Sequence, residues 1–132
     1  MITIPKHLAD EMIKHAYEEL PNEACGLLTG NNGTVQEHYA LTNVDHSPEH
    51  FSFDPQEQFR VLKTARTNGQ KIIANYHSHP NTPARPSEED KRLAYDPNIV
   101  YIIISLAGEI PDIKAFVVDN PLSMQPCEIQ YE

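Results

Sequence analysis

Two histidines and one aspartate near the middle of the chain have the residue types and the spacing of a metal site. Residues 77–80 read HSHP, and after six further residues the segment 87–90 reads SEED. Alternate residues of a strand point to the same face, so the imidazoles of His77 and His79 could bind one ion. A short proline-containing loop could bring the carboxylate of Asp90 beside them. Two histidines, one aspartate and an open fourth position are the pattern of a catalytic zinc site.

Each of these residues also has an ordinary structural explanation. Two histidines separated by one residue on a strand are common on half-exposed surfaces. The spacing of Ser87 and Asp90 is that of a capping box, in which each side chain accepts a backbone N–H of the other at the start of a helix. The cap and the metal site are compatible, because the cap would itself hold Asp90 in the first helical turn.

A hydrolytic metal site also needs a group that moves protons, and Glu23 is the candidate. It leads directly into the apolar segment 24–28 (ACGLL). Zinc lowers the pKa of a bound water toward about 7, and a carboxylate that is not a ligand can then pass a proton to a leaving amine. The alternative is a solvated residue at the start of a strand. Other acids at helical positions are expected to be exposed, namely Glu11, Glu18, Glu19, Glu88 and Glu89.

Hydrophobic spacing and turn signals predict the elements that must position these residues. Helices are expected over 5–20, from the Asp-Pro pair at 54–55 to the Asn-Gly stop at 68–69, and over 87–94. Strands are expected over 24–29, 35–41, 71–78, 99–106 and 113–118, with a weaker one over 127–131. A tight turn at 31–33 joins the first two strands, and 43–54 is a loop. The run IVYIIISL at 99–106 indicates a strand buried on both faces, so we expect a layered α/β domain with a mixed central sheet.

Composition excludes several classes of protein. The chain has 132 residues, which suits a single domain over 1–132, and 10 basic against 19 acidic residues give a net charge of −9. This acidity argues against binding to nucleic acid or to a membrane surface. Cys25 and Cys127 are too few and too far apart for a cysteine-built zinc site. No apolar run approaches the ~20 residues of a membrane span, and the N-terminus does not resemble a signal peptide, so a cytoplasmic location is expected.

The combination of these motifs resembles the JAMM family of metalloproteases, also called MPN+, and in particular its compact stand-alone bacterial members. The matching features are a glutamate entering the first predicted strand, the HSHP segment and, after six intervening residues, the Ser-x-x-Asp segment. The resemblance implies a three-layer fold similar to that of the zinc cytidine deaminases. It also implies Zn²⁺ held by His77, His79 and Asp90, with Glu23 as general acid and base and Ser87 as a hydrogen-bond donor to the oxyanion. Deaminase chemistry itself is disfavoured, because its H-x-E and P-C-x-x-C elements are absent.

The resemblance further implies cleavage after the C-terminal glycines of ubiquitin or of a ubiquitin-like protein. A chain of this length leaves little room for the insertions that grip ubiquitin. A small ubiquitin-like sulfur-carrier protein is therefore the expected partner, and the released group would be a cysteine- or homocysteine-type amino acid or a peptide extension. The alternatives are a deubiquitinase-like enzyme, a general or cell-wall peptidase, and a non-catalytic MPN scaffold. The scaffold is disfavoured because all five motif residues are present.

Some further residues have two interpretations each. Cys25 could face the metal from its place two residues after Glu23, or it could be a small buried hydrophobe. His46 and His50 could line a substrate groove or be exposed. Arg85 could meet a substrate carboxylate or be solvated. The five histidines other than His77 and His79 are expected at the surface.

Overall fold

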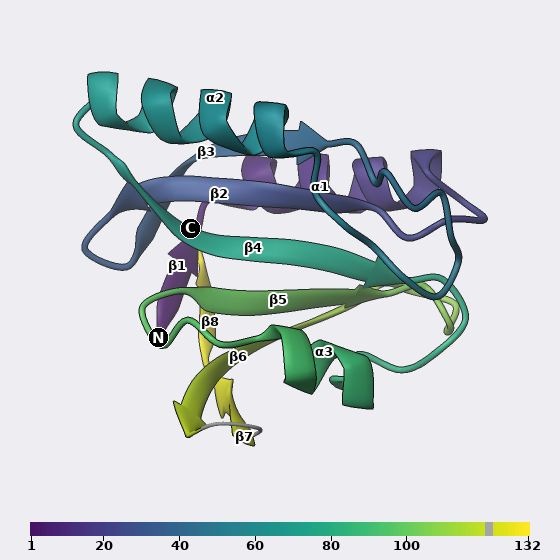
Figure 1. Cartoon of the computed structure of the whole chain (residues 1–132). Helices are drawn as coiled ribbons and strands as arrows, with labels where there is room; N and C mark the ends of the chain where they lie inside the picture. Colours follow the sequence, from purple (N-terminus) through teal and green to yellow (C-terminus); the bar gives the residue numbers. More distant parts are fainter. Residues whose placement is uncertain (121–122) are drawn as a thin grey trace.

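The fold is an eight-stranded sheet with helices on both faces (Figure 1). A computed structural model describes residues 1–120 and 123–132. The strands are β1 (Ile2–Ile4), β2 (Cys25–Asn31), β3 (Thr34–Leu41), β4 (Lys71–His79), β5 (Val100–Ser105), β6 (Asp112–Asn120), β7 (Ser123–Cys127) and β8 (Ile129–Tyr131). The helices are α1 (Lys6–Glu18), α2 (Pro55–Thr67) and α3 (Glu88–Leu93).

The sheet is mixed, as predicted. Its strand order is β7-β6-β5-β4-β2-β3-β1-β8. β4 runs parallel to β5, and β1 runs parallel to both of its neighbours, whereas the other neighbours are antiparallel. β4 therefore lies in the interior of the sheet, with its backbone paired on both sides. Its C-terminal end, at His79, is where the predicted metal ligands lie.

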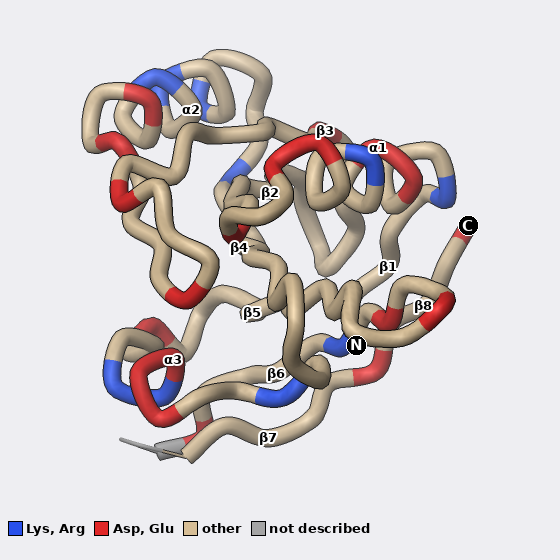
Figure 2. Tube along the Cα trace, turned by 90° about the vertical axis from the view of Figure 1, so that its right-hand side faces the viewer, with Lys and Arg blue, Asp and Glu red and all other residues tan. Residues whose placement is uncertain are grey.

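The helices form the outer two of three layers. The buried face of α1, made by Leu8, Ala9, Met12 and Ala16, packs on one side of the sheet. α2 buries Val61 against Leu27 and Leu41 on the other side. The view along the sheet shows α2 and α3 on one side of the strands and α1 on the opposite side (Figure 2). The predicted three-layer α/β architecture is confirmed.

Local sequence signals explain how the elements begin and end. Asn32 and Gly33 have φ values of 52° and 76°, which are the positive angles that a two-residue hairpin turn between β2 and β3 requires. Asp54 caps α2 by accepting the backbone N–H of Gln56, and Pro55 occupies the first helical position. Gly69, with φ of 69°, follows the end of that helix.

The structure differs from the prediction at the two ends of the chain. β1 was not predicted, because three residues are too few to show a period. The strand predicted over 127–131 proves to be β7 and β8, which lie at opposite edges of the sheet although only Glu128 separates them. Ile2 N donates to Glu128 O at 2.9 Å. The sheet therefore curls, so that its two edge strands, β7 and β8, approach each other at Glu128. This curl depends on pairing between strands that are distant in the sequence.

No helix in the described part of the chain is both long enough and apolar enough to cross a membrane.

Candidate metal centre

His77, His79 and Asp90 converge at the end of β4. His77 Nε2 lies 3.1 Å from His79 Nε2, and Asp90 Oδ2 lies 3.2 Å and 3.1 Å from these two nitrogens. Ligand atoms around a tetrahedral zinc, at bonds of about 2.0–2.1 Å, are separated by roughly 3.3 Å. The three donor atoms therefore have the identity and spacing that such an ion requires. Among the described residues, these three form the one group of His, Cys, Asp and Glu side chains arranged in this way.

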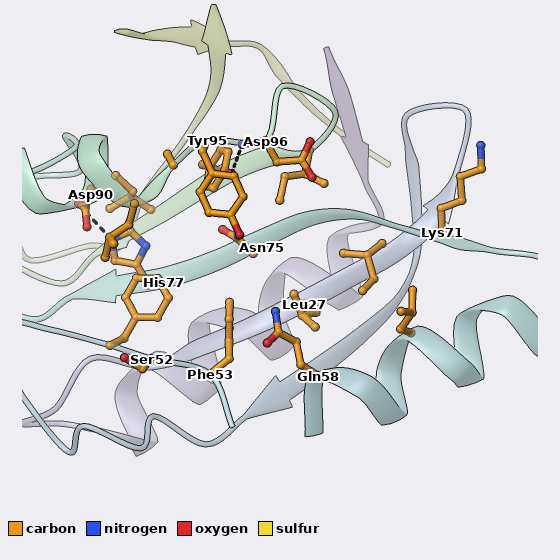
Figure 3. Close-up of a pocket in the computed structure, with 18 of the residues that line it drawn as sticks. Leu27, Ser52, Phe53, Gln58, Lys71, Asn75, His77, Asp90, Tyr95 and Asp96 are labelled. Atoms are coloured by element: carbon orange, nitrogen blue, oxygen red, sulfur yellow. Dashed lines mark hydrogen bonds and ion pairs between the residues drawn. The ribbon is translucent and has the colours of Figure 1, made fainter. Parts of the chain in front are cut away.

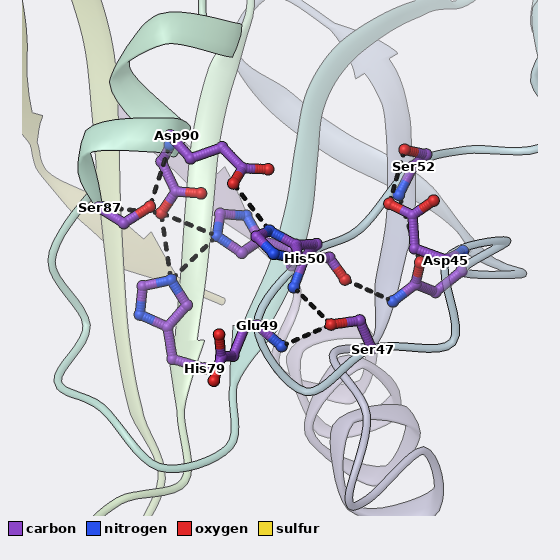
Figure 4. A network of polar contacts seen from close by, with 11 residues as sticks. Asp45, Ser47, Glu49, His50, Ser52, His79, Ser87 and Asp90 are labelled. Atoms are coloured by element: carbon purple, nitrogen blue, oxygen red, sulfur yellow. Dashed lines mark hydrogen bonds and ion pairs between the residues drawn. The ribbon is translucent and has the colours of Figure 1, made fainter.

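Asp90 reaches the histidines because it belongs to the cap of α3. Its Oδ2 atom accepts the backbone N–H of Ser87 at 2.9 Å, and its own N–H is accepted by Ser87 Oγ at 3.0 Å (Figure 4). This is the predicted capping box. The cap holds the carboxylate over the end of β4, so the structural and the metal-binding interpretations of Asp90 apply together.

Contacts outside the cluster orient both imidazoles. His79 Nδ1 lies 2.8 Å from the carbonyl oxygen of Pro83. A carbonyl can only accept, so Nδ1 carries a hydrogen, and Nε2 is the ring nitrogen that faces the cluster. The ring of His77 stacks on Phe51, with centroids 4.6 Å apart and an interplanar angle of 18°. Sequence spacing indicates a role for neither Pro83 nor Phe51, because both contacts depend on how loops fold back.

The charges in the cluster support one another. Burial alone would raise the pKa of Asp90, but hydrogen bonds from His77 and His79 hold it well below its usual range. Burial disfavours the charged form of His79, yet the Asp90 carboxylate and the Pro83 carbonyl outweigh this and raise its pKa. A carboxylate that stays ionised next to two imidazoles is suited to hold a cation.

Glu23 lies beside this cluster because of the register between β2 and β4. Cys25 is paired with His77 in these antiparallel strands, so the residues that precede Cys25 run alongside those that follow His77. Ser78 fixes this register: its Oγ accepts Ala24 N at 2.7 Å, and its N–H donates to Ala24 O at 3.0 Å. Glu23 therefore lies level with His79, at the end of the sheet where the metal ligands are.

The carboxyl group of Glu23 is in a setting that suits proton transfer. The residue is only 5% exposed, and burial raises its pKa to about 8, with smaller contributions from nearby carboxylates and an opposing one from His79. A carboxyl group with a pKa near neutrality can both accept and release a proton under ordinary conditions. The interpretation of Glu23 as a solvated strand-start residue is therefore wrong.

The loop between β3 and α2 covers one side of the site. Asn43, which is 3% exposed, organises it: Asn43 Nδ2 donates to the backbone carbonyls of Glu23 and His50, and Asn43 Oδ1 accepts the N–H of Ser52. His50 Nδ1 lies 2.7 Å from a carboxylate oxygen of Glu89 on α3, which joins the loop to that helix (Figure 4). His50 is itself exposed and is not among the residues that line the groove, so the second of its two interpretations, an exposed histidine, applies.

The remaining candidates from the sequence lie outside the cluster. Cys25 is buried among apolar side chains on the α2 side of the sheet, and burial raises the pKa of its thiol to about 12. Of its two interpretations, the small buried hydrophobe is therefore the correct one. His46 is exposed in the loop, and Arg85 is exposed beside a separate hollow that includes Cys127.

Two other histidines are not simple surface residues, which corrects the expectation for them. The buried hydroxyl of Tyr76 lies 2.7 Å from His15 Nδ1 and 2.7 Å from His38 Nε2. His38 also contacts Glu11 at 3.1 Å. Burial lowers the pKa of both histidines. This network joins α1 and β3 to β4 on the face of the sheet away from the metal ligands. Its three main residues are far apart in the sequence, so no local spacing of residues could predict their contact.

A groove of about 930 Å³ begins at the metal cluster and runs along β4 between α2 and the segment that follows α3 (Figure 3). His77 and Asp90 lie at one end, and Lys71 lies at the other, where β4 begins (Figure 3). Its lining is largely apolar and aromatic, including Leu27, Phe51, Phe53, Leu62, Ile72, Tyr101 and Ile103. The site can therefore accept an extended chain whose end reaches the metal ligands.

Comparison with known proteins agrees with this geometry. The family described as prokaryotic homologues of the JAB domain matches residues 5–119. The CysO-cysteine peptidase of Mycobacterium tuberculosis is 29% identical over 133 residues, covering 98% of this chain and 91% of that protein. The desampylase of Haloferax volcanii is 32% identical over 108 residues, covering 76% and 78%. A probable TtuB-protein conjugate cleaving protease of Thermus thermophilus is 32% identical over 119 residues, covering 89% and 76%.

Solved structures agree as well. The solution structure of a protein from Desulfitobacterium hafniense is 50% identical, with a TM-score of 0.91, and covers 100% of this chain and 93% of that one. The crystal structure of a JAB1/MPN domain protein from Archaeoglobus fulgidus has the same fold at 22% identity, with a TM-score of 0.67 and coverage of 99% and 97%. The resemblance predicted from the motifs is confirmed: the chain belongs to the prokaryotic JAB (JAMM/MPN) domain family and is a JAMM-type peptidase.

Proposed function

We propose that this protein is a zinc-dependent peptidase or isopeptidase that cleaves after the C-terminal Gly-Gly of a small ubiquitin-like sulfur-carrier protein. The released group is an amino acid of the cysteine or homocysteine type, or a peptide extension. One observation carries the proposal: a His-His-Asp cluster lies beside a buried carboxyl group at the end of a long groove.

Zinc is the metal that best suits the donor set. Two imidazole nitrogens and one carboxylate oxygen are ligands that zinc accepts, and three protein ligands leave a fourth position open for chemistry. The bond from His79 Nδ1 to the Pro83 carbonyl is the kind of outer contact that orients a metal-binding histidine. A zinc ion bound there supplies a Lewis acid that polarises a carbonyl group and makes a water molecule more acidic.

The residues of the chain perform the proton transfers of amide hydrolysis. Water adds to the carbonyl carbon of the terminal glycine, and Glu23 accepts the proton that the water loses. The C–N bond then breaks, and Glu23 gives that proton to the departing amine. Ser87 donates its hydroxyl hydrogen to the oxyanion, because its Oγ accepts the Asp90 N–H and its own hydrogen remains free to point into the site.

The groove and the relatives support the choice of substrate. A Gly-Gly end passes close to the metal ligands without side chains that would clash, and the extended residues before it would lie in the apolar groove. The names of the relatives describe removal of cysteine from CysO and cleavage of TtuB-protein conjugates. A carrier protein with a flexible C-terminal tail is the class of substrate that fits both the groove and the names of the relatives.

The proposal is tested with a sulfur-carrier protein from the same genome, carrying cysteine on its terminal glycine through an amide bond. Intact-mass spectrometry follows the loss of the added cysteine. Zinc-loaded wild-type protein should remove it, whereas Glu23→Gln should retain zinc and react about 10²- to 10⁴-fold more slowly. Glu37→Gln, which changes an exposed carboxylate on β3, is the matched control and should react like the wild type.

Two results would contradict the proposal. If wild-type protein with one zinc per chain leaves every such adduct and every Gly-Gly fusion uncut, the substrate class is wrong. If the purified protein takes up no zinc at all, the non-catalytic scaffold would be favoured.

A further inference from the structure

We propose that Arg66 and Lys71, at the end of the groove remote from the metal ligands, select a substrate tail with an acidic residue about six positions before the cleaved bond. This inference rests on the proposed function, because it assigns the groove to the carrier's C-terminal tail. It adds a charge preference that distinguishes among Gly-Gly carriers.

The wall of the groove formed by α2 is apolar at its centre and basic at its end. Gln58, Leu62 and Arg66 all line the groove and follow one another at intervals of four residues. Residues four apart lie on one stripe of a helix, so Arg66 belongs to the same wall as Leu62, one turn further from Gln58. Lys71 begins β4 at that same end and also lines the groove, with its side chain directed away from α2 in the view of Figure 3.

The position of Glu23 decides which part of the substrate enters the groove. Glu23 lies level with His79, at the C-terminal end of β4, whereas the groove leaves His77 in the direction of Lys71. The departing amine must lie near the proton donor, and therefore on the Glu23 side of the metal ligands. The carrier's own tail must then leave in the opposite direction, along the groove.

The length of the groove sets the position of the selected residue. His77 and Lys71 are six residues apart on one strand, which at about 3.3 Å per residue is a distance of about 20 Å. A peptide tail in an extended conformation advances by a similar amount per residue. With the cleaved bond itself level with His77, the sixth residue before it lies about 18 Å along the groove, close to Lys71 and Arg66.

Both cations are available to a substrate. Arg66 and Lys71 are exposed, and neither has a carboxylate within 4.0 Å among the residues the structure describes. Asp96 lines the opposite wall, where its side chain accepts the backbone N–H of Asn98. In a chain with a net charge of −9, this end of the groove thus combines two cations with one acid, and α2 carries three basic residues against one acidic residue.

The test uses peptides that end in Gly-Gly and carry aminomethylcoumarin as an amide on the last glycine, so that hydrolysis releases a fluorophore. Three peptides differ only at the sixth residue before that bond, which is glutamate, glutamine or lysine. The zinc-loaded wild type should cleave the glutamate peptide with a kcat/KM about five-fold above that of the lysine peptide, as expected for two exposed charge contacts. The preference should shrink as salt is added.

Variants assign the preference to the two cations. Arg66→Glu combined with Lys71→Glu should reverse it, and Asp96→Asn should strengthen it. Arg60→Glu combined with Lys63→Glu places the same charge change on residues of α2 that do not line the groove, and it should leave the preference unchanged.

The outcomes separate this inference from the proposed function. If the wild type cleaves all three peptides equally, or if the control pair changes the preference as much as the groove pair, the selection by Arg66 and Lys71 is wrong while the proposed function stands. If no peptide and no carrier is cleaved, the proposed function fails. Fluorescence anisotropy of the same peptides with zinc-loaded Glu23→Gln then decides the charge preference through binding: equal binding overturns it, and tighter binding of the glutamate peptide supports it.

Discussion

The Asp90 oxygen that accepts the N–H of Ser87 is the same oxygen that faces His77 and His79. Asp90 Oδ2 lies 2.9 Å from Ser87 N, and 3.2 Å and 3.1 Å from the two imidazole nitrogens. One carboxylate thus begins α3 and completes the metal cluster. No side chain of α3 is fully buried, so the helix is not anchored by an apolar face. The contacts of Asp90 with the two histidines tie it to the end of β4 instead.

Asp90→Asn should abolish metal binding while the helix cap persists. Asparagine keeps an oxygen that accepts the Ser87 N–H, but it removes the negative charge that balances the ion. We expect zinc affinity to fall by more than the 10- to 100-fold (about 1.4–2.7 kcal/mol) that loss of an outer-shell partner costs. The zinc content after dialysis at a fixed free-zinc concentration measures this. Glu88→Gln, at a 91% exposed carboxylate on the same helix, is the control, and equal loss in both variants would contradict the assignment of Asp90.

Glu23 should make the metal-free protein less stable as the pH rises. Its pKa is about 8 in the fold against 4.5 as the ordinary value, so the folded protein holds a proton that the unfolded chain releases. The free energy of unfolding therefore falls as the pH increases from 4.5 to 8, and this fall should be absent from Glu23→Gln. Urea unfolding with a chelator, at several pH values, measures the difference. A wild type and a Glu23→Gln variant with parallel pH dependence would show that the carboxyl group is not buried as described.

Ser87 should contribute to catalysis separately from its role as a helix cap. Ser87→Gly removes the hydroxyl but costs only a few tenths of a kcal/mol at a cap position, whereas Ser87→Ala costs about 1 kcal/mol. If the hydroxyl donates to the oxyanion, Ser87→Gly at saturating zinc should lower kcat by about 10²- to 10³-fold. Ser87→Thr should restore activity. Thermal unfolding and steady-state kinetics on the same preparations test this, and an active Ser87→Gly would limit the residue to capping.

Tyr76→Phe should destabilise the fold without changing the metal site. The substitution removes the hydroxyl that His15 and His38 both contact at 2.7 Å, and it leaves polar nitrogens without that partner. The expected cost is about 1–3 kcal/mol in the free energy of unfolding. Tyr17→Phe, at an exposed tyrosine of α1, should cost much less. Urea unfolding at neutral pH, together with zinc content, tests the prediction, and an unchanged stability would contradict it.

Strong local signals allowed most of the fold to be predicted from the sequence. Asp54-Pro55 begins α2, Asn32-Gly33 makes the hairpin turn, and the apolar run at 99–106 contains β5. These features depend on backbone preferences and burial patterns within a few residues. β1 and the division between β7 and β8 were missed, because they depend on pairing between the two ends of the chain.

The metal-ligand candidates were likewise evident from the sequence alone. Alternation along β4 places His77 and His79 on one face, and the capping box places Asp90 in the first turn of α3, so both placements follow from local geometry. The same local reasoning could not choose between an exposed and a buried Glu23. Its burial, and with it the raised pKa, comes from strands that meet across more than fifty residues.

By itself, the sequence determined the types of side chain at the site, the order of the helices and of the strands from β2 to β6, and the family to which the chain belongs. Only the tertiary structure decided that Ser78 sets Glu23 level with His79, that Pro83 and Phe51 orient the imidazoles, and that a groove leads from the metal ligands to Arg66 and Lys71. The physical reason is the range of the interactions. Caps, turns and alternation act over one to four residues, whereas burial, register and grooves arise when segments far apart in the chain exclude water together.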